Sequence, residues 1–157
     1  MAAMSNFLEN KLVDWFFRGQ ALGITGASAA AGTGPTSLFI SLFTTTPTDS
    51  TAGTEVTGGS YARQTVTSAL TAWDNTQLAS SSAVSSGTGG TTRNQATITF
   101  SPAPTANWGT VTGVGIHDAI TGGNLLFWSA LTTSKVVNSG DPAPSFAING
   151  LTIQIDN

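Results

Sequence analysis

The spacing of apolar residues changes once along this chain, near residue 35, and that change limits the folds the chain can adopt. Before it, apolar residues recur at helical spacing, as on one face of an α-helix. After it, short apolar runs with a period of two are separated by clusters of glycine, proline and asparagine, as in strands joined by turns. The sequence therefore predicts one N-terminal helix followed by a mainly β region.

The helix is predicted between Asn6 and Arg18. Asn6 is placed to be the N-cap and Glu9 to complete a capping box, while Gly19 is placed to end the helix. We expect residues 1–34 to form this helix and a flexible connector, and residues 35–157 to form a separate β domain.

One apolar stripe is predicted along this helix, with Glu9, Asn10 and Asp14 falling elsewhere. The stripe consists of Leu8, Leu12, Trp15 and Phe16. Such a stripe must be covered, and two interpretations stay open. It packs on this chain's own sheets, which is the simpler interpretation, or it docks onto a neighbouring subunit.

Short strands are predicted after the connector, beginning with SLFISLF, whose alternation indicates a strand covered on both faces. The others are residues 61–67, 96–100, 109–117, 125–130, 135–137 and 151–155. About seven strands with turn signals and no second helix favour an antiparallel β-sandwich, jelly-roll-like in form.

Two tight turns are predicted between consecutive strands, TGGN at residues 121–124 and NSGD at residues 138–141. The stretch from Ser68 to Asn94 consists almost entirely of small polar residues around a single tryptophan. It is typical either of a long excursion or of a ragged edge strand, and the sequence does not choose between the two.

Charge is scarce, at 8% of residues against roughly 25% in ordinary soluble domains, so serine, threonine, asparagine and glycine must solvate the surface. The net charge is -3 and no basic run could neutralise a row of phosphates, which argues against direct nucleic-acid binding. Acidic residues interrupt the apolar N-terminal stretch, and no segment is long and apolar enough to span a membrane. We expect synthesis in the cytoplasm.

The sequence predicts no catalytic, cofactor-binding or metal-binding residues and therefore no enzyme. His117 is the only histidine, and Asp118 beside it in a strand would point to the opposite face, where it could not orient the imidazole. The acidic residues are scattered singly and the glycine-rich segments lack a phosphate-loop lysine. Trp73 is the one tryptophan not assigned to a helix or strand; it could present a face to a sugar, although core or loop anchoring is favoured.

Four segments carry a resemblance to a known family: SNFLENKLVDWFFRG, PTSLFISLFTTTPTD, TEVTGGSYARQTVT and ANWGTVTGVGIHDAITGGNLLFWSALTTSKVVNSGD. Together they resemble small bacteriophage proteins described as tail-fibre or minor virion structural proteins. The resemblance implies location in the virion and a structural role, but no mechanism.

The leading hypothesis is a capsid decoration or cement protein that binds the major capsid protein or other virion proteins and forms a homo-oligomer. The absence of repeats and of coiled-coil heptads favours this over a long fibre shaft. Leu8, Leu12, Trp15 and Phe16 are then the candidate interface. The alternative is a tail-fibre or tail-tip module that binds a host-surface glycan, with Trp73 and residues 80–92 carrying recognition.

Overall fold

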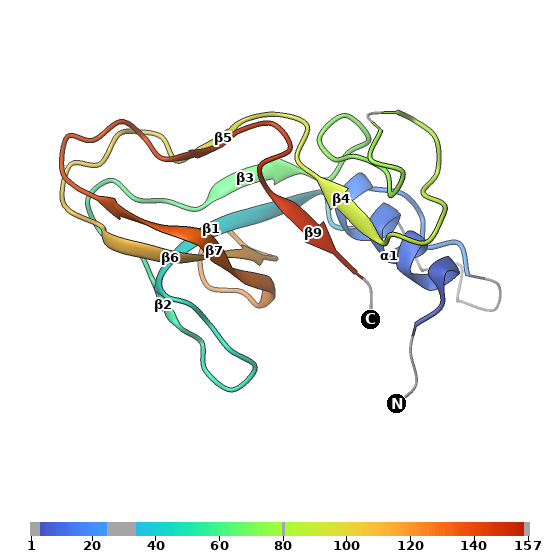
Figure 1. Ribbon diagram of the computed structural model, residues 1–157, viewed down its shortest axis with the longest axis horizontal. Helices are drawn as coiled ribbons and strands as arrows, with labels where there is room; N and C mark the ends of the chain where they lie inside the picture. The colour runs from blue at the N-terminus through green and yellow to red at the C-terminus, as the bar shows by residue number, and fades with distance from the viewer. Residues whose placement is uncertain (1–3, 25–33, 80, 156–157) are drawn as a thin grey trace. The chain divides into compact units, whose positions relative to one another are not determined.

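The computed structural model describes residues 4–24, 34–79 and 81–155 (Figure 1). In this part of the chain one helix precedes nine strands, compared with about seven expected. The elements are α1 (Asn6–Arg18), β1 (Ser37–Thr45), β2 (Thr54–Glu55), β3 (Gln64–Thr67), β4 (Thr91–Arg93), β5 (Ile98–Thr99), β6 (Gly109–His117), β7 (Leu125–Val137), β8 (Ser145–Phe146) and β9 (Thr152–Gln154).

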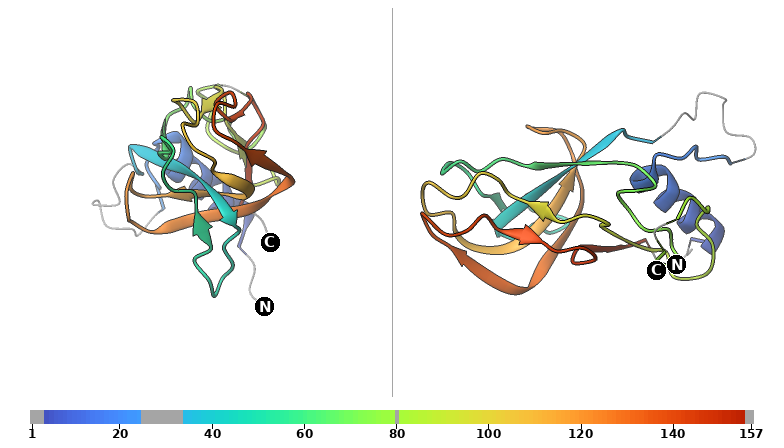
Figure 2. Two further views of the ribbon diagram at one scale, coloured as in Figure 1. Left: turned by 90° about the vertical axis from the view of Figure 1, so that its left-hand side faces the viewer. Right: turned by 90° about the horizontal axis from the view of Figure 1, so that it is seen from above.

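The largest sheet has the strand order β2-β1-β6-β7, and β3 also pairs with β1. The β1–β2, β1–β6 and β6–β7 ladders are antiparallel, as is the separate β4–β9 pair, while β5 pairs with β8. Figure 2 shows these strands from two further directions. The predicted fold class, mainly β with antiparallel sheets and one N-terminal helix, is confirmed.

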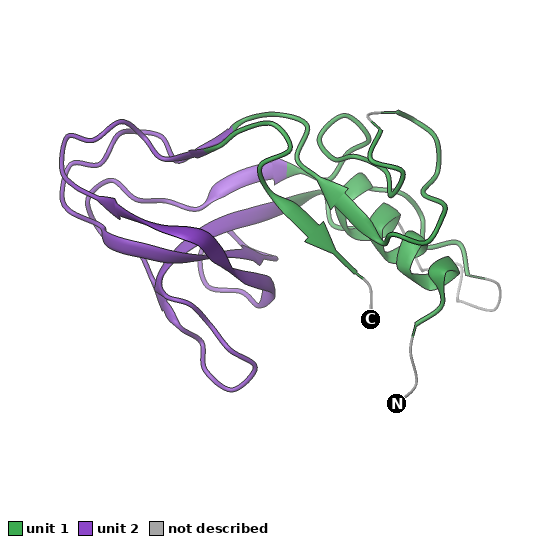
Figure 3. Ribbon diagram, in the orientation of Figure 1, with its two compact units in different colours: residues 1–37, 67–97, 146–157 green, residues 38–66, 98–145 purple. Residues whose placement is uncertain are grey.

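The chain forms two compact units that do not follow its order (Figure 3). Unit 1 contains residues 1–37, 67–97 and 146–157, and unit 2 contains residues 38–66 and 98–145. The helix therefore belongs to the same unit as two segments that come much later in the chain. This division differs from the boundary expected near residue 34.

Strands β1 and β6 form the centre of unit 2, where Ile40 pairs with Ile116 and Leu42 with Val114. Consecutive residues of β1 from Ile40 to Phe43 are all buried, as the alternating run SLFISLF predicts for a strand covered on both faces. Gly115 of β6 allows this packing, because a Cβ there would lie 2.6 Å from the Phe43 ring and 2.8 Å from Leu125 Cδ1.

Helix α1 has the predicted bounds but a different N-cap. Ser5, not Asn6, has the extended cap conformation, and its hydroxyl accepts a hydrogen bond from the Leu8 amide at 3.4 Å. At the other end Gly19 adopts φ +65°, and its amide donates to the Asp14 carbonyl. A Cβ at Gly19 would lie 2.6 Å from the Ser68 carbonyl oxygen, so glycine is required there for space as well as for conformation.

The face that α1 buries is not the one its apolar pattern predicts. Leu8, Leu12, Trp15 and Phe16 are only half-buried. The buried positions lie roughly on the opposite side of the helix. They are Glu9, Asn10, Val13, Asp14, Phe17 and Arg18. The stripe is therefore not the buried face of α1, and the polar residues expected elsewhere are the ones enclosed.

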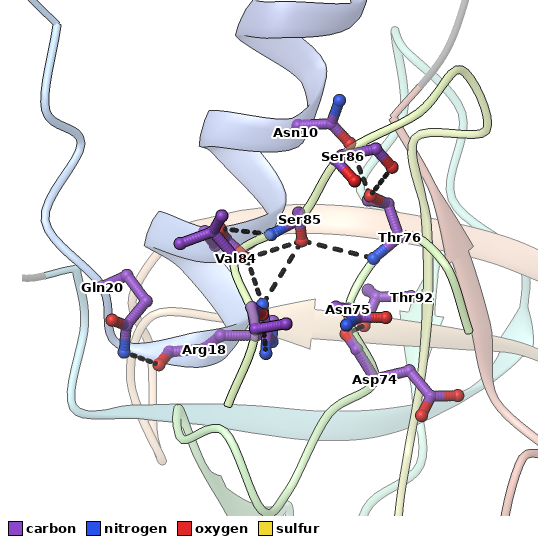
Figure 4. A network of polar contacts seen from close by, with 12 residues as sticks. Asn10, Arg18, Gln20, Asp74, Asn75, Thr76, Val84, Ser85, Ser86 and Thr92 are labelled. Atoms are coloured by element: carbon purple, nitrogen blue, oxygen red, sulfur yellow. Dashed lines mark hydrogen bonds and ion pairs between the residues drawn. The ribbon is translucent and has the colours of Figure 1, made fainter. Parts of the chain in front are cut away.

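Residues 74–79 and 81–87, which we call the polar loop, supply the partners for this buried polar face (Figure 4). Arg18 Nη1 pairs with Asp14 Oδ1 at 2.5 Å, and Arg18 Nη2 donates to the carbonyls of Ser81 and Ala83 at 2.6 and 2.9 Å. Asp14 also accepts hydrogen bonds from the Ser85 hydroxyl and amide. The described residues between 68 and 94 therefore form a long excursion, with the short strand β4 near its end.

One of the two predicted hairpins forms and the other does not. Residues 118–124, which include the predicted turn residues 121–124, join β6 and β7, and the Asp118 amide donates to the Asn124 carbonyl at 3.2 Å to close the connection. Residues 138–141 do make a turn, in which the Asp141 amide donates to the Asn138 carbonyl. The hairpin expected there is wrong, because β8 pairs with β5 and not with β7.

Candidate functional site

A surface hollow of about 500 Å³ lies within unit 2. Strand β2 and the residues that follow it form one side, the segment leading into β3 forms another, and the turn between β6 and β7 closes it. The lining residues are Glu55, Val56, Thr57, Gly58, Tyr61, Ala62, Arg63, Ile120, Thr121 and Gly122.

Arg63 holds the two sides of this hollow together. Its Nε and Nη2 donate to Glu55 Oε1 and Oε2 at 2.9 and 2.7 Å, a bidentate ion pair. Its Nη1 donates to the carbonyls of Ala119 and Gly122, both at 2.7 Å. The guanidinium thus ties β2 to the turn between β6 and β7 and neutralises the one carboxylate of the lining.

Tyr61 is the aromatic residue of the hollow, and its ring is already packed. It stacks on Phe100 at 6.1 Å between centroids and meets Trp108 edge-on at 5.3 Å. Its hydroxyl donates to Glu55 Oε1 and accepts from the Leu42 amide, both at 2.9 Å. Tyr61 therefore fixes the wall of the hollow instead of offering an open aromatic platform.

The ionisable groups of the hollow keep their ordinary charge states near neutral pH. Burial would raise the pKa of Glu55, but hydrogen bonds from Arg63 and Tyr61 hold it below the usual value of 4.5. The hydrogen bond to Glu55 raises the pKa of Arg63, and burial raises that of Tyr61. The cluster thus presents a paired charge with no free proton donor or acceptor near neutrality.

His117 lies in unit 2 at the end of β6 and shows why no catalytic triad forms around it. Its Nε2 lies 3.1 Å from Ser41 Oγ, but Ser41 is fully buried, so the hydroxyl cannot reach a substrate. No described residue partners Nδ1, where an orienting carboxylate would be needed. Asp118 instead accepts hydrogen bonds from the amide and side chain of Asn124 at 2.7 Å, which lower its pKa.

Metal ligands do not cluster in the described part of the chain: no group of three or more histidine, cysteine, aspartate or glutamate side chains could hold an ion there. Within the same residues, no helix is both long and apolar enough to cross a bilayer.

The residues predicted from sequence to form an interface or contact a glycan all fall within unit 1. In the helix stripe, Trp15 and Phe16 meet edge-on at 4.6 Å, and Leu8 and Leu12 lie half-buried beside them. Trp73 is fully buried and packs edge-on against Phe17 at 5.0 Å, so its ring has no face exposed to a sugar. This is the core position that the sequence favoured for it.

Sequence reasoning missed the residues that build the hollow, above all Glu55, Tyr61 and Arg63. One signal was present in TEVTGGSYAR, which places two of the few charged residues of the chain on either side of a glycine turn. In a chain with so little charge, two opposite charges brought together by a turn indicate an ion pair. Their connection to Ile120 and Gly122, about sixty residues away, has no local signal.

Comparison with known families identifies the chain as a structural protein of a phage virion. The family described as podophage GP4 fiber I protein gp80 matches residues 3–154, nearly the whole chain. The chain therefore belongs to this family of fibre proteins. A comparison with curated proteins gives no match. The resemblance to phage structural proteins and the location in the virion, both predicted from the sequence, are confirmed.

Proposed function

We propose that this protein is a component of a phage tail fibre and that the hollow in unit 2 binds a host-surface glycan. The family description, which names a fibre, is the observation that carries the proposal. It supports the tail-fibre hypothesis better than the decoration hypothesis that the sequence alone favoured. A fibre family also fits a structural or binding role better than an enzymatic one.

The chemistry of the hollow suits a neutral sugar. Its volume lies within the range of small-molecule sites, roughly 300 to 1,000 Å³. Hydroxyls of Thr57 and Thr121 and the carboxylate of Glu55 are hydrogen-bonding groups for sugar hydroxyls, and Ile120, which is 52% exposed, offers an apolar contact. Because Arg63 already neutralises Glu55, a neutral glycan is favoured over an acidic one.

This proposal moves recognition away from Trp73 and residues 80–92. Trp73 lies in the core of unit 1. Arg18 and Asp14 of α1 form hydrogen bonds with carbonyl, hydroxyl and amide groups of the polar loop. Groups committed to α1 are not available to an external ligand without loss of these hydrogen bonds.

Binding of the purified full chain to host cells and to a panel of their surface glycans tests this function. Ile120→Trp would fill the hollow and should reduce binding at least tenfold. Val84→Trp, at a 65% exposed position of unit 1, is the matched control and should bind as the unmodified protein does. Absence of cell binding by the unmodified chain, or equal binding by both variants, would contradict the proposal.

A second candidate role is attachment to another virion protein through the apolar side of α1. Leu8, Leu12, Trp15 and Phe16 are half-buried on the side of the helix away from the polar network. Leu12→Asp should abolish capture of the partner from disrupted phage particles, whereas Lys11→Asp, the adjacent control, should not. Truncating the helix is unsuitable as a test, because it would also remove Arg18 and the buried network.

A further inference from the structure

Few hydrogen-bonding groups of the hollow in unit 2 are left for a ligand. Arg63 has five N–H donors, and four of them already donate to Glu55 and to two carbonyls of the turn between β6 and β7. The Tyr61 hydroxyl both donates and accepts a hydrogen bond within the wall. Among the described residues, this leaves one Arg63 N–H and the remaining acceptor capacity of the Glu55 carboxylate. The hydroxyls of Thr57 and Thr121 complete the set.

The rest of the lining is apolar. Val56, Ala62 and Ile120 contribute hydrocarbon side chains, and Gly58 and Gly122 contribute only backbone. Val56 is 3% exposed and Ile120 is 52% exposed, so Ile120 and the exposed Ala62 provide the apolar contact for a ligand. A sugar hydroxyl placed against these side chains would lose its hydrogen bonds to water without replacement, which is unfavourable. A fully hydroxylated sugar therefore matches this side of the hollow poorly.

Arg63 sets the spacing between the polar and the apolar side of the hollow. Its Nε and Nη2 bind the two Glu55 oxygens at 2.9 and 2.7 Å. Its Nη1 binds the carbonyls of Ala119 and Gly122, which lie on either side of Ile120 in the sequence, both at 2.7 Å. The carboxylate and the turn that carries Ile120 are thus held by opposite parts of one small, planar guanidinium. A single sugar unit can contact both.

We propose that the hollow selects a sugar that carries a methyl group near a ring hydroxyl, with the methyl group against Ile120 and Ala62 and the hydroxyl donating to Glu55. The inference rests on the proposed glycan-binding function and names the class of glycan within it. Two kinds of sugar have this chemistry: a 6-deoxyhexose, whose methyl group is C6, and an N-acetylhexosamine, whose methyl group belongs to the acetamido group. Only the second offers a carbonyl oxygen to the unused Arg63 N–H.

NMR titration of the full chain with matched sugars tests this selection. L-Rhamnose is compared with L-mannose, which differs only by a hydroxyl at C6, and N-acetylglucosamine is compared with glucose. At least one methyl-bearing sugar should bind about tenfold more tightly than its fully hydroxylated counterpart, the lower end of the effect of one hydrocarbon group in an apolar site. A preference confined to one pair identifies which of the two sugar classes supplies the methyl group.

A variant pair locates the preference in the hollow. Ile120→Ser should abolish it, because the variant removes the apolar contact for the methyl group. Val136→Ser, at a 56% exposed position of unit 2 outside the lining, is the matched control and should keep the preference. Circular dichroism of both variants checks that they fold.

The outcomes separate this inference from the proposed function on which it rests. If host glycans bind but neither sugar pair shows a preference, or if folded Ile120→Ser keeps the preference, the inference is overturned and the proposed function stands. If the unmodified chain binds no glycan of the panel, both are overturned. The sugar pairs are compared on the unmodified chain, so that comparison does not depend on the folding of a variant.

Discussion

The chain contains two arginine clusters built in the same way but placed differently. In unit 1 Arg18 pairs with Asp14 and binds two carbonyls of the polar loop; in unit 2 Arg63 pairs with Glu55 and binds two carbonyls of the Ala119 to Gly122 turn. The first pair is enclosed, with side chains 0% and 5% exposed, and the second borders an open hollow, at 9% and 25%. The same chemistry stabilises structure in one unit and shapes a surface in the other.

Arg93 repeats the arrangement. Its Nε and Nη2 donate to Asp74 Oδ2 at 2.9 and 2.7 Å, and Nη2 also donates to the Leu78 carbonyl at 3.1 Å. All three arginines of the sequence therefore link a carboxylate to loop carbonyls. A guanidinium suits this role because its planar fork carries five donors. In a chain with few charges, arginine ties long loops to the regular elements.

The largest expected effect follows from breaking the enclosed cluster. Arg18→Met would leave the Asp14 carboxylate buried without its counter-charge, which costs about 3 to 5 kcal/mol in comparable sites. Urea denaturation should show a corresponding fall in the free energy of unfolding. The paired variant Asp14→Leu/Arg18→Met, which removes both charges, should recover much of the loss; if it does not, the ion pair is not what makes Arg18 important.

Breaking the open cluster should cost less. In Arg63→Met water can hydrate the partly exposed Glu55, so we expect a loss of about 1 to 3 kcal/mol from the hydrogen bonds. Glycan binding should fall together with the free energy of unfolding, because the turn that carries Ile120 loses its hydrogen bonds to Arg63. Equal stability losses for Arg18→Met and Arg63→Met would remove the distinction between the two clusters.

Acid should weaken the open cluster through Glu55. Its pKa is lowered in the folded protein, so its contribution to stability is fully present above the unfolded value near 4.5 and is lost as pH falls through the folded value. Unfolding free energies from pH 6 to pH 3 should therefore fall less steeply for Glu55→Gln than for the unmodified chain. Parallel curves of unfolding free energy against pH for the two proteins would show that Glu55 does not cause the loss of stability in acid.

The smallest expected effect concerns His117. Burial, with Arg63 nearby, lowers its pKa below the usual 6.5. The unfolded chain then takes up a proton first, so stability should decline slightly as pH falls through 6.5 towards the folded pKa. Because His117 is the only histidine, His117→Asn should flatten the unfolding free energy between pH 7 and pH 5. An unchanged slope would show that burial does not hold the imidazole neutral.

Local patterns predicted the helix bounds, the Gly19 cap, β6 and its hairpin with β7, because periodicity and turn residues act over a few positions. They failed on the buried face of α1, since apolar patterning assumes that an apolar stripe meets the core. In this helix Asp14 and Arg18 are enclosed because Ser85 donates to the Asp14 carboxylate and the carbonyls of Ser81 and Ala83 accept from Arg18 Nη2. Those partners lie more than sixty residues away and leave no periodic signal.

The hollow escaped prediction for the same reason. Glu55 and Arg63 are close in sequence, but the turn containing Ile120 is brought to them by the pairing of β6 with β1, which joins residues at least seventy positions apart. The resemblance of the sequence to phage structural proteins identified a virion protein, but it did not say whether the protein lies on the head or on the tail. That place separates the fibre hypothesis from the decoration hypothesis.

Immunogold electron microscopy of intact phage particles, with an antibody against this chain, tests the central claim most directly. The account predicts gold on the tail fibres and none on the head, and absorption of the antibody with purified protein should abolish it. Gold distributed over the capsid surface, with the tail unlabelled, would contradict the proposed function and restore the decoration hypothesis.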